Sequence, residues 1–261
     1  SSAAASDVYK RQGEVWEDAT TKFGFDHRRT YLLGKGLDSV MNYPFKNAVL
    51  DFVKGKPAEQ AANEILTICE HYPAPAIDTA LNFLSTHDTE RALTVIADEP
   101  ANGRGRQWQS GRCVTGDAYE EGLLRLRMAY AIIYTLPGVP CLYYGDEIAM
   151  QGYRDPFNRA FFRWDAHEQR LRPVLAQLAQ LRHTCEAFRT GKLWVLRAEG
   201  GILHYQRIGE VETAEIIVNR TEHIIVETLA SGKSTEVNPM GFTIVVEEVG
   251  HNPNHSYYDY V

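Results

Sequence analysis

Apolar residues in the first two thirds of the chain recur partly at helical spacing and partly in short runs. Helical spacing begins at Pro57, a residue favoured at the first position of a helix, and ends before Pro73. The same periodicity predicts helices over residues 117–136 and 168–188. The second half of segment 117–136 is apolar on every face, so we expect that helix to be deeply packed.

Short apolar runs lie between these helices and predict β-strands. They cover residues 37–42, 80–85 and 140–144, and residues 13–17 read as a strand end that runs into a loop. Strands that alternate with helices are typical of parallel βα units. We therefore expect a parallel sheet or barrel over residues 13–188.

The pattern changes after Gly191, where strand-like runs follow one another with short turns between them. The runs cover residues 193–198, 201–208, 214–220, 223–229 and 242–249. Glycine-containing turns at residues 199–201 and 231–233 separate some of them. This spacing predicts an antiparallel all-β domain over residues 190–250.

The number of strands predicts that the chain is the C-terminal part of a longer protein. A (β/α)8 barrel needs eight strands and roughly 250 residues, whereas the pattern supplies three strands and one strand end. Residues 1–12 contain neither a Met nor the apolar core of a signal peptide, and we expect a non-native or disordered leader there. Residues 251–261 show no periodicity and predict a loose tail.

Composition narrows the class of protein. The chain is 44% hydrophobic and 23% charged, which is typical of a globular protein and excludes a disordered one. A net charge of −7 without a basic patch argues against a nucleic-acid partner, and no apolar run approaches the roughly 18 residues of a membrane span. The four cysteines, Cys69, Cys113, Cys141 and Cys185, form no CxxC pair. We expect buried free thiols, no metal centre and, on the thiols alone, a cytoplasmic location.

Polar residues follow the predicted strands at the points where a barrel carries its chemistry. Glu14 follows the first strand, Tyr43 the second, and His87 and Asp88 the third. Cleavage of a glycosidic bond needs a carboxylic acid for the leaving oxygen and negative charge near an oxocarbenium-like transition state. Glu14 and Asp88 fit that chemistry. The open alternatives are a solvated loop acid for Glu14 and a helix N-cap for Asp88.

Several blocks of sequence resemble the α-amylase family, glycoside hydrolase family 13. They are residues 13–16 (GEVW), 83–88 (FLSTHD), 138–147 (GVPCLYYGDE), 155–159 (DPFNR) and 162–165 (FRWD), in the order and spacing of that family. Residues 41–45 (MNYPF) and 87–91 (HDTER) are most similar to the neopullulanase, cyclomaltodextrinase and maltogenic amylase branch. The resemblance implies an α/β fold, the C-terminal portion of a (β/α)8 barrel (strands 5–8), followed by a small antiparallel β-sandwich.

The resemblance also implies roles for the residues at the strand ends. Glu14 would be the general acid/base, and Asp88 the second acid, which holds substrate hydroxyls and stabilises the transition state. His87 would hydrogen-bond the sugar at the point of cleavage. Asp146 and Glu147 are expected to orient their own loop.

Further residues are implied as substrate-binding. Asp155 and Arg159 would touch the neighbouring sugar, and Trp16 and Tyr43 would stack on sugar faces. The alternatives left open are a local ion pair between Asp155 and Arg159 and plain packing for the two aromatic rings.

One element of the family pattern is absent from this sequence, the G-x-R-x-D block whose Asp is the nucleophile. A retaining mechanism needs that carboxylate about 5 Å from the acid, so we expect this chain alone to be inactive. The intact parent would be a retaining hydrolase of α-1,4 glucosidic bonds in cyclomaltodextrins, maltooligosaccharides or pullulan, with α-1,6 cleavage left open. An α-glucosidase, a sucrose- or trehalose-converting relative and a non-catalytic sugar-binding protein remain alternatives. No cofactor is implied, and relatives suggest a homodimeric parent.

Overall fold

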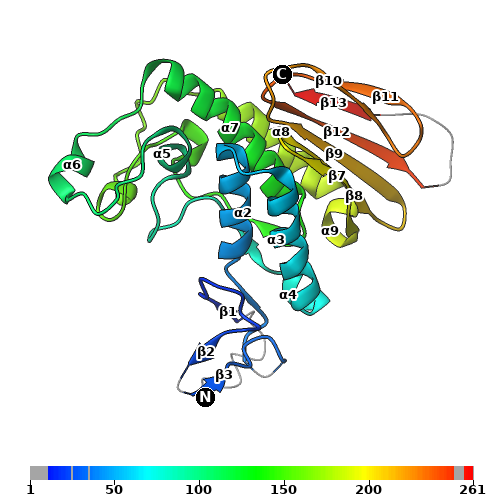
Figure 1. Ribbon diagram of the computed structural model, residues 1–261, viewed down its shortest axis with the longest axis horizontal. Helices are drawn as coiled ribbons and strands as arrows, with labels where there is room; N and C mark the ends of the chain where they lie inside the picture. Colours follow the sequence, from blue (N-terminus) through cyan, green and yellow to red (C-terminus); the bar gives the residue numbers. More distant parts are fainter. Residues whose placement is uncertain (1–10, 25, 35, 250–255, 261) are drawn as a thin grey trace.

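The computed structural model describes residues 11–24, 26–34, 36–249 and 256–260. Figure 1 shows an α/β part and a β-sheet part packed together, with the small hairpin of β2 (Phe23–Gly24) and β3 (His27–Arg28) far from the large sheet. Among the described helices, none has both the length and the apolar character needed to cross a bilayer.

Four short strands of the α/β part run parallel, as the alternating pattern predicts. β1 (Gln12–Gly13) pairs with β4 (Ser39–Val40), and β5 (Leu81–Asn82) pairs with β6 (Val139–Pro140). A parallel bridge between Met41 and Leu81 joins the two pairs. The strands follow one another in chain order, so their carboxyl ends meet at one edge.

The strand expected over residues 140–144 is largely absent. β6 ends at Pro140, although the Cys141 amide still donates to the Asn82 carbonyl at 2.7 Å. Gly145 then takes a left-handed φ of 89° and opens the short 3-10 helix η1 (Asp146–Ile148), which turns the chain out of the sheet. Residues 140–143 are only half-buried and Tyr144 is 39% exposed, so the apolar character of this run does not correspond to a buried strand.

The helices agree with the periodicity in most places. α3 (Ala58–His71) and α7 (Gly116–Thr135) lie where helices are predicted, with Pro57 directly before α3 rather than in its first position. α2 (Tyr43–Lys54) was not predicted; the Asn42 side chain caps it by accepting a hydrogen bond from the Phe45 amide at 3.2 Å. The remaining short helices are α4 (Ala74–Ile77), α5 (Ala92–Ala97), α6 (Arg106–Ser110) and η2 (Phe157–Arg159).

The helix expected over residues 168–188 is divided into α8 (Leu171–Thr184) and α9 (Glu186–Thr190). Cys185 between them has extended backbone angles. The Glu212 carboxylate accepts a hydrogen bond from the Glu186 amide at 2.9 Å, which starts the second helix in a new direction toward the sheet.

The β part consists of a five-stranded antiparallel sheet with a hairpin packed on it. The sheet order is β13-β12-β9-β8-β7, made by β7 (Lys192–Glu199), β8 (Ile202–Ile208), β9 (Glu212–Asn219), β12 (Gly241–Glu248) and β13 (Ser256–Tyr260). The hairpin of β10 (Ile225–Thr228) and β11 (Ser234–Val237) packs on it through a small apolar cluster that includes Ile217 and Val245. The loose tail expected over residues 251–261 is wrong for β13, which pairs antiparallel with β12 and so satisfies the backbone groups on the edge of β12 that faces away from β9. The expected leader, apart from residues 11 and 12, lies outside the described residues.

One apolar core joins the two parts of the molecule. Tyr205 of β8 lies 2.6 Å, oxygen to oxygen, from the Thr135 hydroxyl at the end of α7. The fully buried Arg207 donates to the carbonyls of Thr135 and Gly191, both at 2.7 Å. These bonds fix the sheet against the α/β part.

Of the four free cysteines, Cys185 is buried and Cys69 and Cys141 are half-buried. The expectation of buried thiols is wrong for Cys113, which is exposed in the loop between α6 and α7.

Candidate active site

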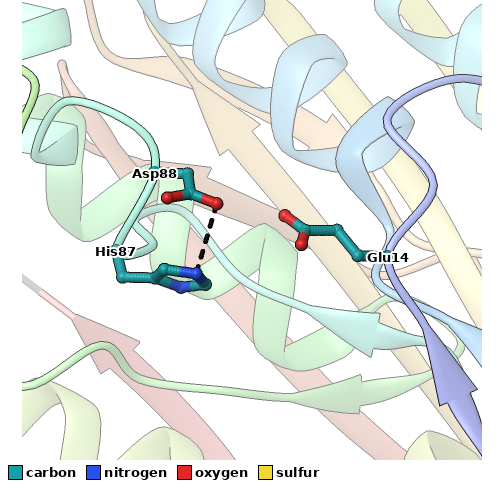
Figure 2. A group of neighbouring side chains, drawn as sticks. All are labelled: Glu14, His87 and Asp88. Atoms are coloured by element: carbon teal, nitrogen blue, oxygen red, sulfur yellow. Dashed lines mark ion pairs between the residues drawn. The ribbon is translucent and has the colours of Figure 1, made fainter.

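The carboxyl ends of the parallel strands bring three predicted residues together. Glu14 directly follows β1, whereas His87 and Asp88 lie on the loop after β5. Figure 2 shows the three side chains directed toward one another. Each offers a polar side-chain atom, and these atoms all lie within 4.8 Å of one another. The structure thus assembles the residues that the sequence places at strand ends, while their chemical roles stay predictions.

Tyr43 holds the carboxylate of Glu14. Its hydroxyl donates to Glu14 Oε1 at 2.7 Å, and only 1% of the residue is exposed. The ring lies parallel to Trp16, with centroids 4.5 Å apart, and edge-on to Phe83 at 4.9 Å. Burial and the Glu14 carboxylate raise the pKa of Tyr43 well above its usual value, so the hydroxyl keeps its proton.

The expectation that Tyr43 stacks on a sugar is therefore wrong, because its ring is buried between two other aromatic side chains. The packing alternative is the correct one. Trp16, by contrast, is 48% exposed beyond its contact with Tyr43, and its role as a sugar platform stays a prediction.

Asp88 is held from two sides. His87 Nε2 lies 3.2 Å from Asp88 Oδ2, and Arg159 Nη2 donates to Asp88 Oδ1 at 3.0 Å. Arg159 also forms an ion pair of 3.3 Å with Asp155, which confirms the local pairing left open by the sequence. The N-cap alternative for Asp88 is wrong, since Arg91 directly precedes α5.

Asn158 fixes the turn that carries His87 and Asp88. The side chain of Asn158 is fully buried. Its Nδ2 donates to the carbonyls of Thr86, His87 and Thr89 at 3.2, 2.7 and 2.8 Å. Sequence reasoning missed this residue, because the block at 155–159 drew attention only to its charged members.

The buried ion pair of Arg91 and Asp146 holds the backbone of Asn158 in place. Arg91 donates through Nε to the Asn158 carbonyl at 3.0 Å, and its Nη1 lies 3.1 Å from Asp146 Oδ1. Tyr130 donates to the other oxygen of Asp146 at 2.6 Å. The expected orienting role of Asp146 is confirmed by these contacts, and that of Glu147 by the bond that Glu147 accepts from the Gly145 amide at 2.7 Å.

Replacing Asn158 with alanine is expected to lower the free energy of unfolding by about 1–3 kcal/mol, because the buried carbonyls of Thr86 and Thr89 lose this donor. The His87 carbonyl keeps its hydrogen bond from Arg159 Nε at 2.8 Å. Urea unfolding followed by circular dichroism measures the change. Asn63→Ala, at an exposed position of α3, should change stability by no more than about 0.5 kcal/mol. Equal effects of the two substitutions would contradict the role of Asn158.

The sequence of the chain is similar to that of known proteins. The sequence profile described as "Alpha amylase, catalytic domain" matches residues 5–202. The chain is 31% identical over 210 residues to an amylopullulanase of Thermoanaerobacter thermohydrosulfuricus, an alignment that covers 74% of the chain and 13% of that protein. It is 32% identical over 225 residues to a cyclomaltodextrinase of Geobacillus thermopakistaniensis, covering 84% of the chain and 33% of that protein.

Among solved structures, the cyclic alpha-maltosyl-(1→6)-maltose hydrolase of Arthrobacter globiformis is similar in fold. The TM-score is 0.77 at 24% identity, over 94% of this chain and 50% of that one. The chain thus spans half of this solved chain, and a smaller share of the two sequence relatives.

Proposed function

Because the chain belongs to the α-amylase family, we propose that it forms strands 5–8 of a (β/α)8 barrel and the β-sandwich that follows. In this assignment β1, β4, β5 and β6 are the four barrel strands. The five-stranded sheet and the β10–β11 hairpin are the sandwich. The parallel order of the four strands and the match over residues 5–202 support the assignment.

The function that we propose is retaining hydrolysis of α-1,4 glucosidic bonds, with α-1,6 bonds as a further target. Cyclomaltodextrins, maltooligosaccharides and pullulan are the proposed substrates, by analogy with the cyclomaltodextrinase and amylopullulanase relatives. The observation that carries the proposal is the convergence of Glu14, His87 and Asp88 at the carboxyl ends of parallel strands.

In the proposed mechanism Glu14 protonates the leaving oxygen and later activates water. The Tyr43 hydroxyl donates to Glu14 Oε1 at 2.7 Å and so holds the carboxylate in a fixed orientation at the end of β1. Asp88 stabilises positive charge on the sugar ring, and Arg159 keeps its carboxylate directed into the site. The nucleophilic Asp belongs to a segment outside this sequence.

The chain alone is therefore expected to show no turnover of cyclomaltodextrin, maltotriose or pullulan. Extending it with its upstream coding sequence should supply the nucleophile and restore hydrolysis, measured as release of reducing sugar. An extended protein that folds but cleaves none of these substrates would contradict the proposal.

One observation favours a second assignment of the nucleophile. One side-chain oxygen of Glu14 lies within 4.8 Å of one of Asp88, which is compatible with the separation of about 5–5.5 Å between the two carboxyl groups of retaining enzymes. If the chain alone proves active, Asp88 becomes the nucleophile, and Asp88→Asn should abolish that activity.

A further inference from the structure

The three residues at the strand ends form a donor set that suits a metal ion. In the described part of the chain, Glu14, His87 and Asp88 are the one group of at least three His, Cys, Asp or Glu residues with ligand atoms within 4.8 Å of one another. We propose that this cluster binds a divalent transition-metal ion such as Zn²⁺, and that the ion blocks the sugar site. The inhibitory consequence rests on the proposed function, whereas the binding does not.

The spacing of His87 and Asp88 fits a tetrahedral ion without rearrangement. Their facing atoms, Nε2 and Oδ2, are 3.2 Å apart. Two ligand bonds of about 2.0–2.1 Å at a tetrahedral angle put the ligand atoms about 3.3–3.4 Å apart. The ion would therefore lie between these two atoms, and Glu14 would reach it with a small side-chain rotation.

Outer partners hold the two carboxylates in a suitable orientation. Tyr43 donates to Glu14 Oε1 and Arg159 donates to Asp88 Oδ1, while Asp88 Oδ2 faces His87 Nε2. Hydrogen-bonded outer groups of this kind tune metal ligands in proteins. The carboxylates of Glu14, Asp88 and Asp155 also outnumber the single guanidinium of Arg159, which leaves a net negative charge for a cation.

The ion can enter, because the side chains of His87 and Asp88 are 55% and 36% exposed. Three protein ligands leave a fourth position for water, as in open zinc sites. An imidazole with only two carboxylates suits Zn²⁺ or Cu²⁺, whereas Ca²⁺ takes six or more oxygen ligands and Mg²⁺ demands octahedral geometry.

Binding would remove Glu14 from acid catalysis and His87 from the sugar, so the ion and the sugar should compete.

Isothermal titration calorimetry of the chain with ZnCl₂ and with MgCl₂ tests the proposal. We expect one Zn²⁺ site, no Mg²⁺ site, and at least about a 10-fold loss of Zn²⁺ affinity in His87→Asn and in Asp88→Asn, since even outer-group losses cost 10–100-fold. Titrating maltotriose with and without Zn²⁺ then separates the two claims. Zn²⁺ binding without any sugar binding would count against the proposed function only.

Two matched controls test two other candidate zinc ligands. His71→Asn removes an exposed histidine that is paired with one carboxylate, Asp18, and Cys113→Ser removes the exposed thiol. Both variants should keep the Zn²⁺ affinity. Affinity that survives His87→Asn and Asp88→Asn, in variants with an unchanged circular dichroism spectrum, would overturn the proposal. If either variant unfolds, Glu14→Gln takes its place and must weaken Zn²⁺ binding.

Discussion

Replacing Asp146 with alanine is expected to lower the free energy of unfolding by about 3–5 kcal/mol. The substitution leaves the Arg91 guanidinium, which is fully buried, without its carboxylate at 3.1 Å. It also removes the acceptor of the buried Tyr130 hydroxyl. An uncompensated buried charge is far more destabilising than the absence of the whole pair. Chemical unfolding of the wild type and the variant measures the difference.

A double-mutant cycle separates the ion pair from packing. Arg91→Met alone should also destabilise the chain, but the double variant Arg91→Met, Asp146→Ala should be more stable than the sum of the single effects predicts. Asp51→Asn removes an exposed carboxylate with a 3.5 Å ion pair to Lys56 and should change stability by about 0.5 kcal/mol or less. A cost for Asp146→Ala near that of Asp51→Asn would contradict the buried pair.

The sequence predicts an element well where the pattern that defines it lies within the residues of that element. α7 has a long apolar stretch and appears within one residue of the predicted bounds. α2 was hidden because its start, Tyr43-Pro44, resembles a loop after a strand, although Asn42 followed by Pro44 is a helix-start signal. β11 is a largely polar run, so the sequence pattern alone does not show it, although it pairs with β10 across the short turn at residues 229–233.

Some features of the candidate site could likewise be predicted from the sequence, and others could not. Glu14, His87 and Asp88 could be predicted to meet, because parallel strands put their carboxyl ends at one edge. The role of Tyr43 in holding Glu14 could not be predicted, because it depends on the packing of the Tyr43 ring between Trp16 and Phe83. Asn158 binds backbone carbonyls about 70 positions away, and no sequence pattern encodes such a contact.

Glu14→Gln is expected to lower kcat on maltooligosaccharides by about 10²–10⁴-fold in the protein extended to include its nucleophile, because that is the contribution of a positioned general acid. Glutamine keeps the shape of the side chain and can still accept the hydrogen bond from Tyr43, so the site should stay assembled. The loss should be much smaller on α-glucosyl fluoride, whose leaving group departs without protonation. Initial rates on both substrates give the ratio.

Glu17→Gln is the matched control, since Glu17 lies on the same loop but pairs with Lys22 and is largely exposed. It should leave both rates unchanged. Equal losses on the two substrates in Glu14→Gln would mean that the residue positions the sugar and does not deliver a proton. An unchanged rate on maltooligosaccharides would remove Glu14 from the mechanism, and the cluster that it forms with His87 and Asp88 would then act in binding alone.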